Sequence, residues 1–319
     1  MPENFDYITP PTHSFAGLPV CTQLNDLTAD IAIIGLHFVS PYPQKLTPAA
    51  TRNAPETAPD AIRLQSSIFI DHWDHYDFNF DELLLADRQV RLADCGDVDK
   101  QTTGGVQNPE RITAAIRAIL RRGAIPIALG TDEGGFIPFA RAYSGCKALC
   151  VVHIDAHIDW RHERHGVLEG YSSGMRRASE MPWVKAMAQV GLRGIGSARQ
   201  QEIDDALSFG SVFIRAREVH RNGIQACIDK IPAADHYLIT IDTDALDTAI
   251  APGVLFPSPG GLAFDETTDL VRGIALKGKI AGIGLFEVRP ERDINGLTAS
   301  TGAQLIINFI GTMVRSGRR

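Results

Sequence analysis

Short apolar runs alternate with amphipathic helical patterns along most of this 319-residue chain. Each run has the length of a single strand, and each is followed by turn residues or a helical pattern. Such alternation predicts an α/β fold, a three-layer α/β/α sandwich in which helices cover both faces of a mainly parallel, roughly eight-stranded sheet. The predicted strands lie near 31–35, 90–94, 124–129, 148–154, 187–192, 211–214, 237–242 and 280–286, and predicted helices include 108–122, 199–208, 222–230, 264–276 and 301–314.

The sequence predicts a short N-terminal arm followed by one large domain. Residues 1–29 are polar and contain proline, so we expect an arm that packs on the domain or on a neighbouring molecule. Residues 30–319 contain no internal repeat or low-complexity linker, and 44% of the whole chain is hydrophobic, enough for one large core. Asn108 before Pro109 is typical of a helix start.

Composition limits the classes of protein to which the chain can belong. Five cysteines, an odd number, argue against a disulfide framework and predict a reducing, cytoplasmic location. Cys95, Cys150 and Cys227 lie in apolar contexts and are expected in the core. We see no apolar run long enough to span a bilayer and no secretory leader. A net charge of −7 without a basic stripe argues against a nucleic-acid partner.

The run VVHIDAHID at 151–159 carries chemistry at the end of a predicted strand. Side chains alternate with period two along a strand, so Asp155, His157 and Asp159 can point to one side. Carboxylate oxygens together with one imidazole nitrogen suit a hard divalent metal. The sequence therefore favours a metal site, and the alternative is a strand edge with solvated acids.

A second acidic cluster ends another apolar run. The segment YLITIDTDALD at 237–247 brings Asp242 and Asp244 to one face, with Asp247 shortly after. Open α/β sheets bind ligands at the carboxyl edge of their strands. Acids brought together from two strand ends would repel one another without a cation between them. The two clusters together predict a two-metal site at this edge of the sheet.

Several motifs in the same order resemble a known family. DAHID at 155–159, TIDTDALD at 240–247 followed by PGV at 252–254, and LADCGDV at 92–98 are similar to signatures of the ureohydrolases, the arginase, agmatinase and guanidinobutyrase family. The likeness runs from about residue 30 to the C-terminus and includes IAIIGLHF at 31–38, TAPDAIR at 57–63 and LFEVRPERD at 285–293. The resemblance implies an arginase-like fold and hydrolysis of guanidino groups at a binuclear centre.

The resemblance also implies a set of metal ligands, with one departure. The chain matches five of the family's six ligands, and the sixth, normally a histidine, is replaced by Glu133 in the segment GTDE at 130–133. An anionic oxygen in place of a neutral nitrogen makes the bound metal a weaker Lewis acid. Three consequences are open: a different metal preference, weaker binding of the first metal ion, or a site that holds a single metal ion. The implied metal ligands are Glu133, Asp155, His157, Asp159, Asp242 and Asp244, with Asp155 and Asp242 bridging two Mn²⁺ or Ni²⁺ ions.

A second departure concerns proton transfer. Related enzymes carry a histidine after the DAHxD motif that is thought to shuttle protons, and Ser173 stands at that position here. A serine hydroxyl can orient a substrate or a water, but its pKa is too high for it to buffer a proton near neutrality. His162, with Glu163 and His165 on the same loop, is a candidate replacement, although for any one of these residues a solvated charged loop is the favoured interpretation. Asp159 is the other candidate, since the family implies that its counterpart takes the proton from water.

Glu287 follows an apolar strand, where a charge needs a partner. In the family the matching glutamate binds the substrate guanidinium, whose planar fork fits a carboxylate. The alternative is a structural salt bridge to Arg289 or Arg292. The predicted catalytic residues are therefore Asp159, Glu287, Ser173 and His162, of which Glu287 and Ser173 would also bind substrate.

The expected reaction is hydrolytic cleavage of a C–N bond in a guanidino-type substrate, which releases an amine and urea or a urea-like product. Agmatine, a guanidino acid, guanidine itself and a biguanide such as metformin are all open as substrates. A basic loop favours a carboxylate or an uncharged tail; its arginines are Arg161, Arg164, Arg176 and Arg177. The other open alternative is a noncatalytic subunit that pairs with an active paralogue. The resemblance also implies an oligomer, a trimer or hexamer of identical chains or a hetero-oligomer.

Overall fold

The computed structural model of the chain describes residues 4–43, 57–98, 109–146, 148–196 and 198–317. Its centre is a nine-stranded sheet with the order β1-β5-β2-β6-β11-β10-β7-β8-β9, in which every pairing is parallel except that of β1 with β5. The strands are β1 (Ile8–Thr9), β2 (Ile31–Leu36), β5 (Leu92–Val98), β6 (Ile125–Gly130), β7 (Leu149–Ile154), β8 (Val184–Leu192), β9 (Val212–Arg215), β10 (His236–Asp242) and β11 (Lys279–Phe286).

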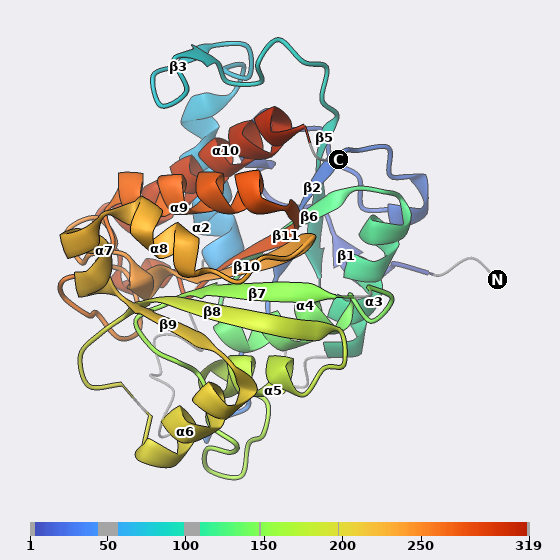
Figure 1. Cartoon of the computed structure of the whole chain (residues 1–319). Helices are drawn as coiled ribbons and strands as arrows, with labels where there is room; N and C mark the ends of the chain where they lie inside the picture. Colours follow the sequence, from blue (N-terminus) through green and yellow to red (C-terminus); the bar gives the residue numbers. More distant parts are fainter. Residues whose placement is uncertain (1–3, 44–56, 99–108, 147, 197, 318–319) are drawn as a thin grey trace.

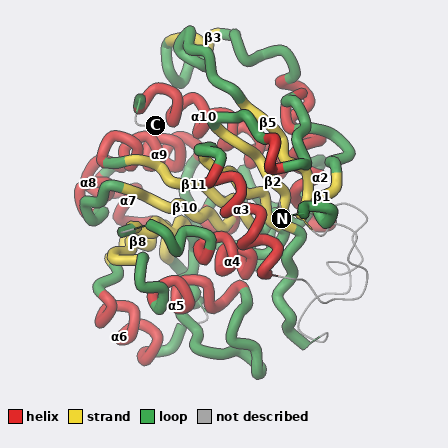
Figure 2. Tube along the Cα trace, turned by 90° about the vertical axis from the view of Figure 1, so that its right-hand side faces the viewer, coloured by secondary structure: helices red, strands yellow, loops and turns green. Residues whose placement is uncertain are grey.

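Helices cover both faces of this sheet (Figure 1), so the predicted three-layer sandwich is confirmed. In the turned view of Figure 2 the strands lie between α9 and α10 on one side and α4 and α5 on the other. One face carries α2 (Ala58–Ser66), α7 (Ala216–Asn222), α8 (Ile224–Lys230), α9 (Phe264–Lys277) and α10 (Leu297–Ser316). The other face carries α3 (Pro109–Arg121), α4 (Phe136–Arg141), α5 (Gly174–Ser179) and α6 (Gln200–Phe209).

The two faces of the sheet hold separate hydrophobic cores. Along β2, Ile31 and Ile33 belong to one core, and Ala32 and Ile34 belong to the other. A parallel strand covered on both faces is apolar at every position, which explains why these strands appear in the sequence as continuous apolar runs. All eight predicted strands are present, and the ninth is β1.

The ninth strand comes from the N-terminal segment. Ile8 and Thr9 pair antiparallel with Val98 and Asp97 at the edge of the sheet. Phe5, Phe15 and Leu24 are fully buried, so this segment packs closely against the domain. A two-residue strand has no periodicity that a sequence pattern could reveal. The predicted helix start at Asn108 lies outside the described residues, and α3 begins at Pro109.

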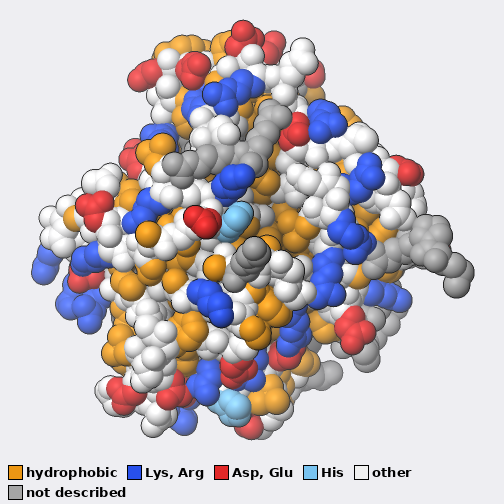
Figure 3. All heavy atoms as spheres, turned by 45° about the vertical axis from the view of Figure 1, so that its right-hand side comes forward, with side chains coloured by type: hydrophobic (Ala, Val, Ile, Leu, Met, Phe, Trp, Pro, Cys, Tyr) orange, Lys and Arg blue, Asp and Glu red, His pale blue; other side chains and the backbone are white. Residues whose placement is uncertain are grey.

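Two further features concern the surface. The 20-residue α10 is long and apolar enough by composition to cross a membrane, but most of it is buried inside the fold, as expected of a core helix. A small hairpin of β3 (Tyr76–Asp77) and β4 (Glu82–Leu83) projects beyond the sheet (Figure 1). On the face drawn in Figure 3, acidic and basic side chains are scattered among hydrophobic ones.

The order of the strands fixes where a ligand site can form. After β6 the chain continues to β7, and β10 and β11 later insert between these two strands. The carboxyl ends of β6, β11, β10 and β7 therefore lie next to one another around a topological switch point. In open α/β sheets this crevice is the usual place for a ligand.

Candidate metal centre

The acids predicted from the sequence meet at this carboxyl edge. Glu133 lies in the 3₁₀ turn Glu133–Gly135 that follows β6, and Asp242 and Asp244 lie where β10 ends. Asp155 and Asp159 lie in the loop after β7. All five carboxylates are buried, with at most 6% of any residue exposed.

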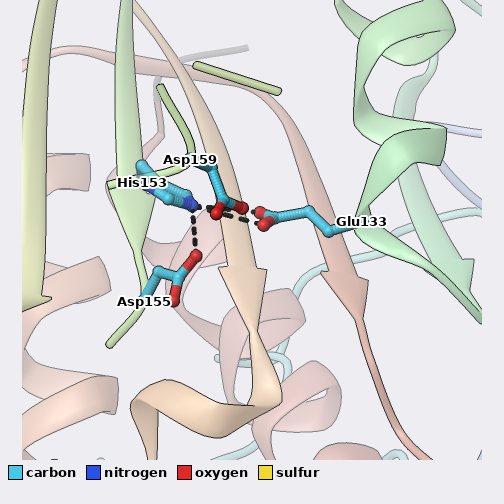
Figure 4. Close-up of side chains that lie close together, drawn as sticks. All are labelled: Glu133, His153, Asp155 and Asp159. Carbon is cyan, nitrogen blue, oxygen red and sulfur yellow. Dashed lines mark hydrogen bonds and ion pairs between the residues drawn. The ribbon is translucent and has the colours of Figure 1, made fainter. Parts of the chain in front are cut away.

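Two groups of possible ligands share one residue. The first contains Glu133, His153, Asp155 and Asp159, and the second contains Asp155, His157 and Asp244; within each group the ligand atoms lie within 4.8 Å of one another. In Figure 4, Glu133 reaches in from the segment after β6 and faces the side chains that follow β7. Asp155 is common to both groups, which is the arrangement expected of a carboxylate that bridges two ions.

Asp242 belongs to neither group but lies beside the second. Its Oδ1 accepts a hydrogen bond from the backbone N–H of Asp244 at 2.8 Å and so caps the short helical turn Thr243–Ala245. The same carboxylate lines the pocket described below. Its role as the second bridging ligand stays a prediction.

The electrostatics of the site call for cations. Burial raises the pKa of Asp159 and of Asp242 well above the usual value, and neighbouring carboxylates raise it further. Burial, and the charge of Asp155, raise the pKa of Asp244 to about 7. Oδ2 of Asp155 is buried and has no aligned hydrogen-bond donor. Because divalent ions offer the missing compensation, and oxygen with imidazole donors suits them, these residues fit a binuclear centre.

The backbone around the site is held in uncommon conformations. Asp159 and Glu287 have φ angles of 43° and 66°, in the left-handed region. Non-glycine residues adopt this region at a cost, and such residues concentrate at functional sites. Gly191 on β8 also has a positive φ, of 107°, and a Cβ there would lie 2.9 Å from the carbonyl oxygen of Asp155. Glycine at this position therefore lets β8 pack against the loop that carries Asp155.

A pocket of about 220 Å³ opens over the acids. Apolar, aromatic and basic side chains complete its wall, and a larger cavity of about 570 Å³ lies where β6 and β11 begin and contains none of these acids. The pocket is large enough for a small guanidino compound. It is lined by His157, Asp159, Arg164, Tyr171, Ser172, Ile195, Gly196, Asp242, Asp244, Phe256 and Glu287.

Glu287 both lines this pocket and forms the salt bridge that the sequence left open. Its Oε2 accepts hydrogen bonds from Nη2 and Nε of Arg289 at 2.7 and 3.2 Å. Its Oε1 accepts from the backbone N–H of Glu133 at 3.0 Å. Burial, only partly offset by the charge of Arg289, raises the pKa of Glu287 to about 7. The carboxylate is thus already anchored before any substrate guanidinium arrives.

Two predicted site residues do not reach the pocket. The pocket wall contains Ser172 rather than Ser173, and the hydroxyl of Ser173 is buried without a hydrogen-bond partner. His162 is exposed, and its Nδ1 lies 3.3 Å from Nη2 of Arg177. Tyr171–Ser173 forms a 3₁₀ turn that leads into α5. In this turn the side chains of the two adjacent serines have different surroundings, and only Ser172 lies in the pocket wall. The predicted roles of Ser173 and His162 therefore stay predictions that the pocket wall does not support.

His153 is the site residue that sequence reasoning missed. It is fully buried, and its Nε2 lies 2.8 Å from Oδ2 of Asp155 and 3.2 Å from Oε1 of Glu133. The signal was present, because residue 153 continues the period-two series formed by 155, 157 and 159. It was hidden inside the apolar strand, where a histidine is commonly an ordinary buried residue.

The basic loop contains one arginine that differs from the others. Arg161 pairs with Glu202, Arg176 with Asp205 and Glu180, and Arg177 with Glu180. Arg164 has no carboxylate partner among the described residues. Its guanidinium lies 5.4 and 5.5 Å from the ring centres of Tyr42 and Tyr171, and it donates to the Tyr171 hydroxyl at 3.1 Å.

Comparison with known proteins identifies the family. The family model described as "Arginase family" matches residues 29–311. The chain belongs to the arginase family. It is therefore a ureohydrolase-family enzyme for guanidino compounds, and it carries buried groups of candidate metal ligands.

Individual relatives agree with this assignment. Guanidinopropionase of Pseudomonas aeruginosa is 30% identical over 240 residues, which cover 72% of this chain and 74% of that protein. Agmatinase of Pyrococcus horikoshii is 27% identical over 289 residues, or 90% and 93% of the two chains. The fold matches that of proclavaminate amidino hydrolase from Streptomyces clavuligerus with a TM-score of 0.77 at 24% identity, over 97% and 99% of the two chains.

Proposed function

We propose that this arginase-family protein hydrolyses a C–N bond of a short guanidino acid and releases urea and an amine. The observation that carries the proposal is the pair of ligand groups that share Asp155 beneath a pocket of about 220 Å³. Glu133, Asp155, His157, Asp159, Asp242 and Asp244 would hold two Mn²⁺ or Ni²⁺ ions. When bound, these ions would activate water and stabilise negative charge that develops during attack on the guanidinium carbon.

Glu287 would hold the guanidinium of the substrate. Each carboxylate oxygen can accept two hydrogen bonds, and Oε1 of Glu287 accepts only the one from the backbone N–H of Glu133, so this oxygen keeps acceptor capacity for a guanidinium. Asp159 also lines the pocket and is the chain's best-placed group to take the proton that water loses. His162 is exposed and Ser173 is absent from the wall, which favours Asp159 for this role.

The anionic tail follows from Arg164. Among the described residues that line the pocket it is the only arginine, and it has no carboxylate partner there. The Tyr42 and Tyr171 rings hold its guanidinium in place through cation–π contacts. A substrate carboxylate would supply the missing charge, because carboxylate and guanidinium form paired hydrogen bonds. The cationic tail of agmatine would meet a like charge instead.

The test is an assay of the full chain after loading with Mn²⁺ or Ni²⁺. Urea and amine release would be measured on guanidinopropionate, guanidinobutyrate, agmatine, arginine, guanidine and metformin, together with metal content per chain. We expect one or two ions per chain and the highest kcat/KM on a guanidino acid. A preference for metformin or guanidine would overturn the substrate class. Bound metal without any turnover would favour the noncatalytic-subunit alternative.

Assembly and location are part of the proposal as well. We expect a trimer or hexamer, with identical or paralogous chains, which light scattering with mass analysis would distinguish from a monomer. All five cysteines are free in the structure, which supports a reducing compartment such as the cytoplasm. A monomer at assay concentration would contradict the assembly.

A further inference from the structure

The carboxylate of Glu133 is held from both oxygens by buried neighbours. Thr240 on β10 donates its hydroxyl to Oε1 at 2.9 Å. Nε2 of His153 on β7 lies 3.3 Å from Oε2. Glu133, Thr240 and His153 are all completely buried, so no solvent competes for these contacts.

Gln189 on β8 determines which nitrogen of His153 carries the proton. The side-chain amide nitrogen of Gln189 donates to the carbonyl oxygen of Ile158 at 2.8 Å, and its Oε1 accepts from Ser211 at 3.0 Å. A flipped amide would place two oxygens 2.8 Å apart, so the orientation of Gln189 is fixed. The same amide nitrogen lies 3.0 Å from Nδ1 of His153. Nδ1 must therefore accept, and the neutral ring carries its proton on Nε2.

The proton on Nε2 has one aligned acceptor. Asp155 Oδ2 lies 2.8 Å from Nε2, within ion-pair distance, but this contact is not aligned with the ring N–H. The ring N–H is aligned with Oε2 of Glu133 at 3.3 Å, and Figure 4 draws the contacts of His153 with both Glu133 and Asp155. The aligned hydrogen bond of the histidine is therefore the one to the glutamate.

We propose that His153 is a positioning residue that holds Glu133 as a metal ligand through an Nε2–H···Oε2 hydrogen bond, in the tautomer set by Gln189. The hydrogen bond fixes the rotamer of Glu133 and withdraws charge from a fifth carboxylate in a crowded anionic site. A neutral donor thus offsets part of the cost of an anionic ligand. Outer partners of this kind typically change metal affinity by roughly 10–100-fold. The inference rests on the proposed function only in that the cluster binds divalent metal.

The experiment compares two substitutions of His153 in the full chain. His153→Gln retains an amide that can donate to Glu133 but removes the imidazole, and His153→Leu removes both. Mn²⁺ stoichiometry and affinity would be measured by titration calorimetry, and the unfolding of the metal-free proteins by circular dichroism. We expect His153→Leu to lose about 10–100-fold in affinity for one ion and His153→Gln to stay within about threefold of wild type.

Two further variants sharpen the result. Gln189→Leu removes the amide that donates to Nδ1, so the tautomer of His153 is no longer fixed, and we expect the affinity for the same ion to fall by about tenfold. His236 is exposed at the start of β10, far from the acids, and His236→Leu serves as the matched control with unchanged binding.

Several outcomes would overturn the proposal. Equal losses in His153→Gln and His153→Leu would mean that the imidazole itself is a ligand, and wild-type affinity in His153→Leu would mean that it has no role. A wild-type chain that binds no Mn²⁺ would also reject the inference. A wild-type chain that binds metal but hydrolyses no guanidino compound would defeat the proposed function while leaving this comparison of affinities intact.

Discussion

Two sets of buried carboxylates lie on the same sheet, and they differ in what balances their charge. Asp94 and Asp97 on β5 are fully buried around the guanidinium of Arg63 from α2. Arg63 donates to Asp94 at 2.8 and 2.9 Å and to Asp97 at 2.5 Å. Although burial opposes it, hydrogen bonding from His37 and the charge of Arg63 hold the pKa of Asp97 well below its usual range. The charges of this set are balanced within the chain.

The candidate metal centre has no such cation. Among the described residues, its five carboxylates form ion pairs only with histidines, and no lysine or arginine pairs with them. The pKa values of Asp159 and Asp242 are accordingly raised by burial and by like charges, the opposite of the shift at Asp97. The difference indicates that the first set stabilises the fold and that the second set is suited to bind cations from solution.

The largest expected effect comes from removing the internal cation. Arg63→Met leaves Asp94 and Asp97 buried without compensation, and breaking a buried pair in this way costs about 3–5 kcal/mol. Urea unfolding of the metal-free chain would measure the loss. The matched control is Arg91→Met, because Arg91 pairs with Asp30 at the surface with 64% of its side chain exposed. That variant should lose less than about 1 kcal/mol, and equal losses would erase the distinction between the two sets.

Removing one charge from the metal centre should leave the stability of the fold intact and reduce metal binding instead. Asp242→Asn keeps an oxygen that can accept from the N–H of Asp244, so the cap of the 3₁₀ turn survives. We expect the free energy of unfolding of the metal-free variant to lie within about 1 kcal/mol of the wild-type value or above it, because one of several buried charges that repel one another is removed. Affinity for Mn²⁺ and hydrolysis should each fall by roughly 100-fold or more, since even outer partners of a metal are worth 10–100-fold. A strongly destabilised metal-free variant would place Asp242 in the structural set.

The fold was largely predictable because its physical cause is repetitive. Strands buried on both faces are apolar throughout, and such runs are visible without knowledge of their neighbours. The two-residue β1 carries no such pattern and depends on its pairing with Val98 and Asp97. Whether helices covered one face or both followed from the alternation of strands and helices.

The metal centre was predictable only where ligands lie at strand ends. Period two pointed to Asp155, His157 and Asp159, but the strand ends at Ile154, so these three residues converge through a loop and only His153 lies on the strand itself. The choice between Ser172 and Ser173 depends on how the 3₁₀ turn meets α5, which no local pattern specifies. The pairing of Glu287 with Arg289 was one of two alternatives, and the choice between them depends on side-chain contacts that the sequence does not specify.

The compensated set also predicts a pH dependence. Asp97→Asn removes a carboxylate whose folded pKa lies below its ordinary value near 3.8. A lowered folded pKa gives stability that is complete above the unfolded pKa and is lost as the pH falls through the folded one. At pH 7 the free energy of unfolding of the wild type should therefore exceed that of Asp97→Asn by about 2 kcal/mol. Below about pH 4 the difference should shrink, as measured by urea unfolding across pH. A difference that grows on acidification would contradict the compensation by Arg63.

The smallest expected effect concerns two arginines, one paired with carboxylates inside the fold and one without a carboxylate partner among the described residues. Arg63 is saturated by carboxylates, whereas Arg164 lines the pocket and has none among the described residues. In Arg164→Met we expect the KM for a guanidino acid to rise about tenfold, as one partly exposed charged hydrogen bond is lost, while the KM for agmatine stays equal or falls. Arg176→Met is the control, because Arg176 already pairs with Asp205 and Glu180. Steady-state urea release on both substrates decides the matter: a parallel rise in both KM values would make Arg164 a structural residue of the pocket wall, and the anionic tail would lose its support.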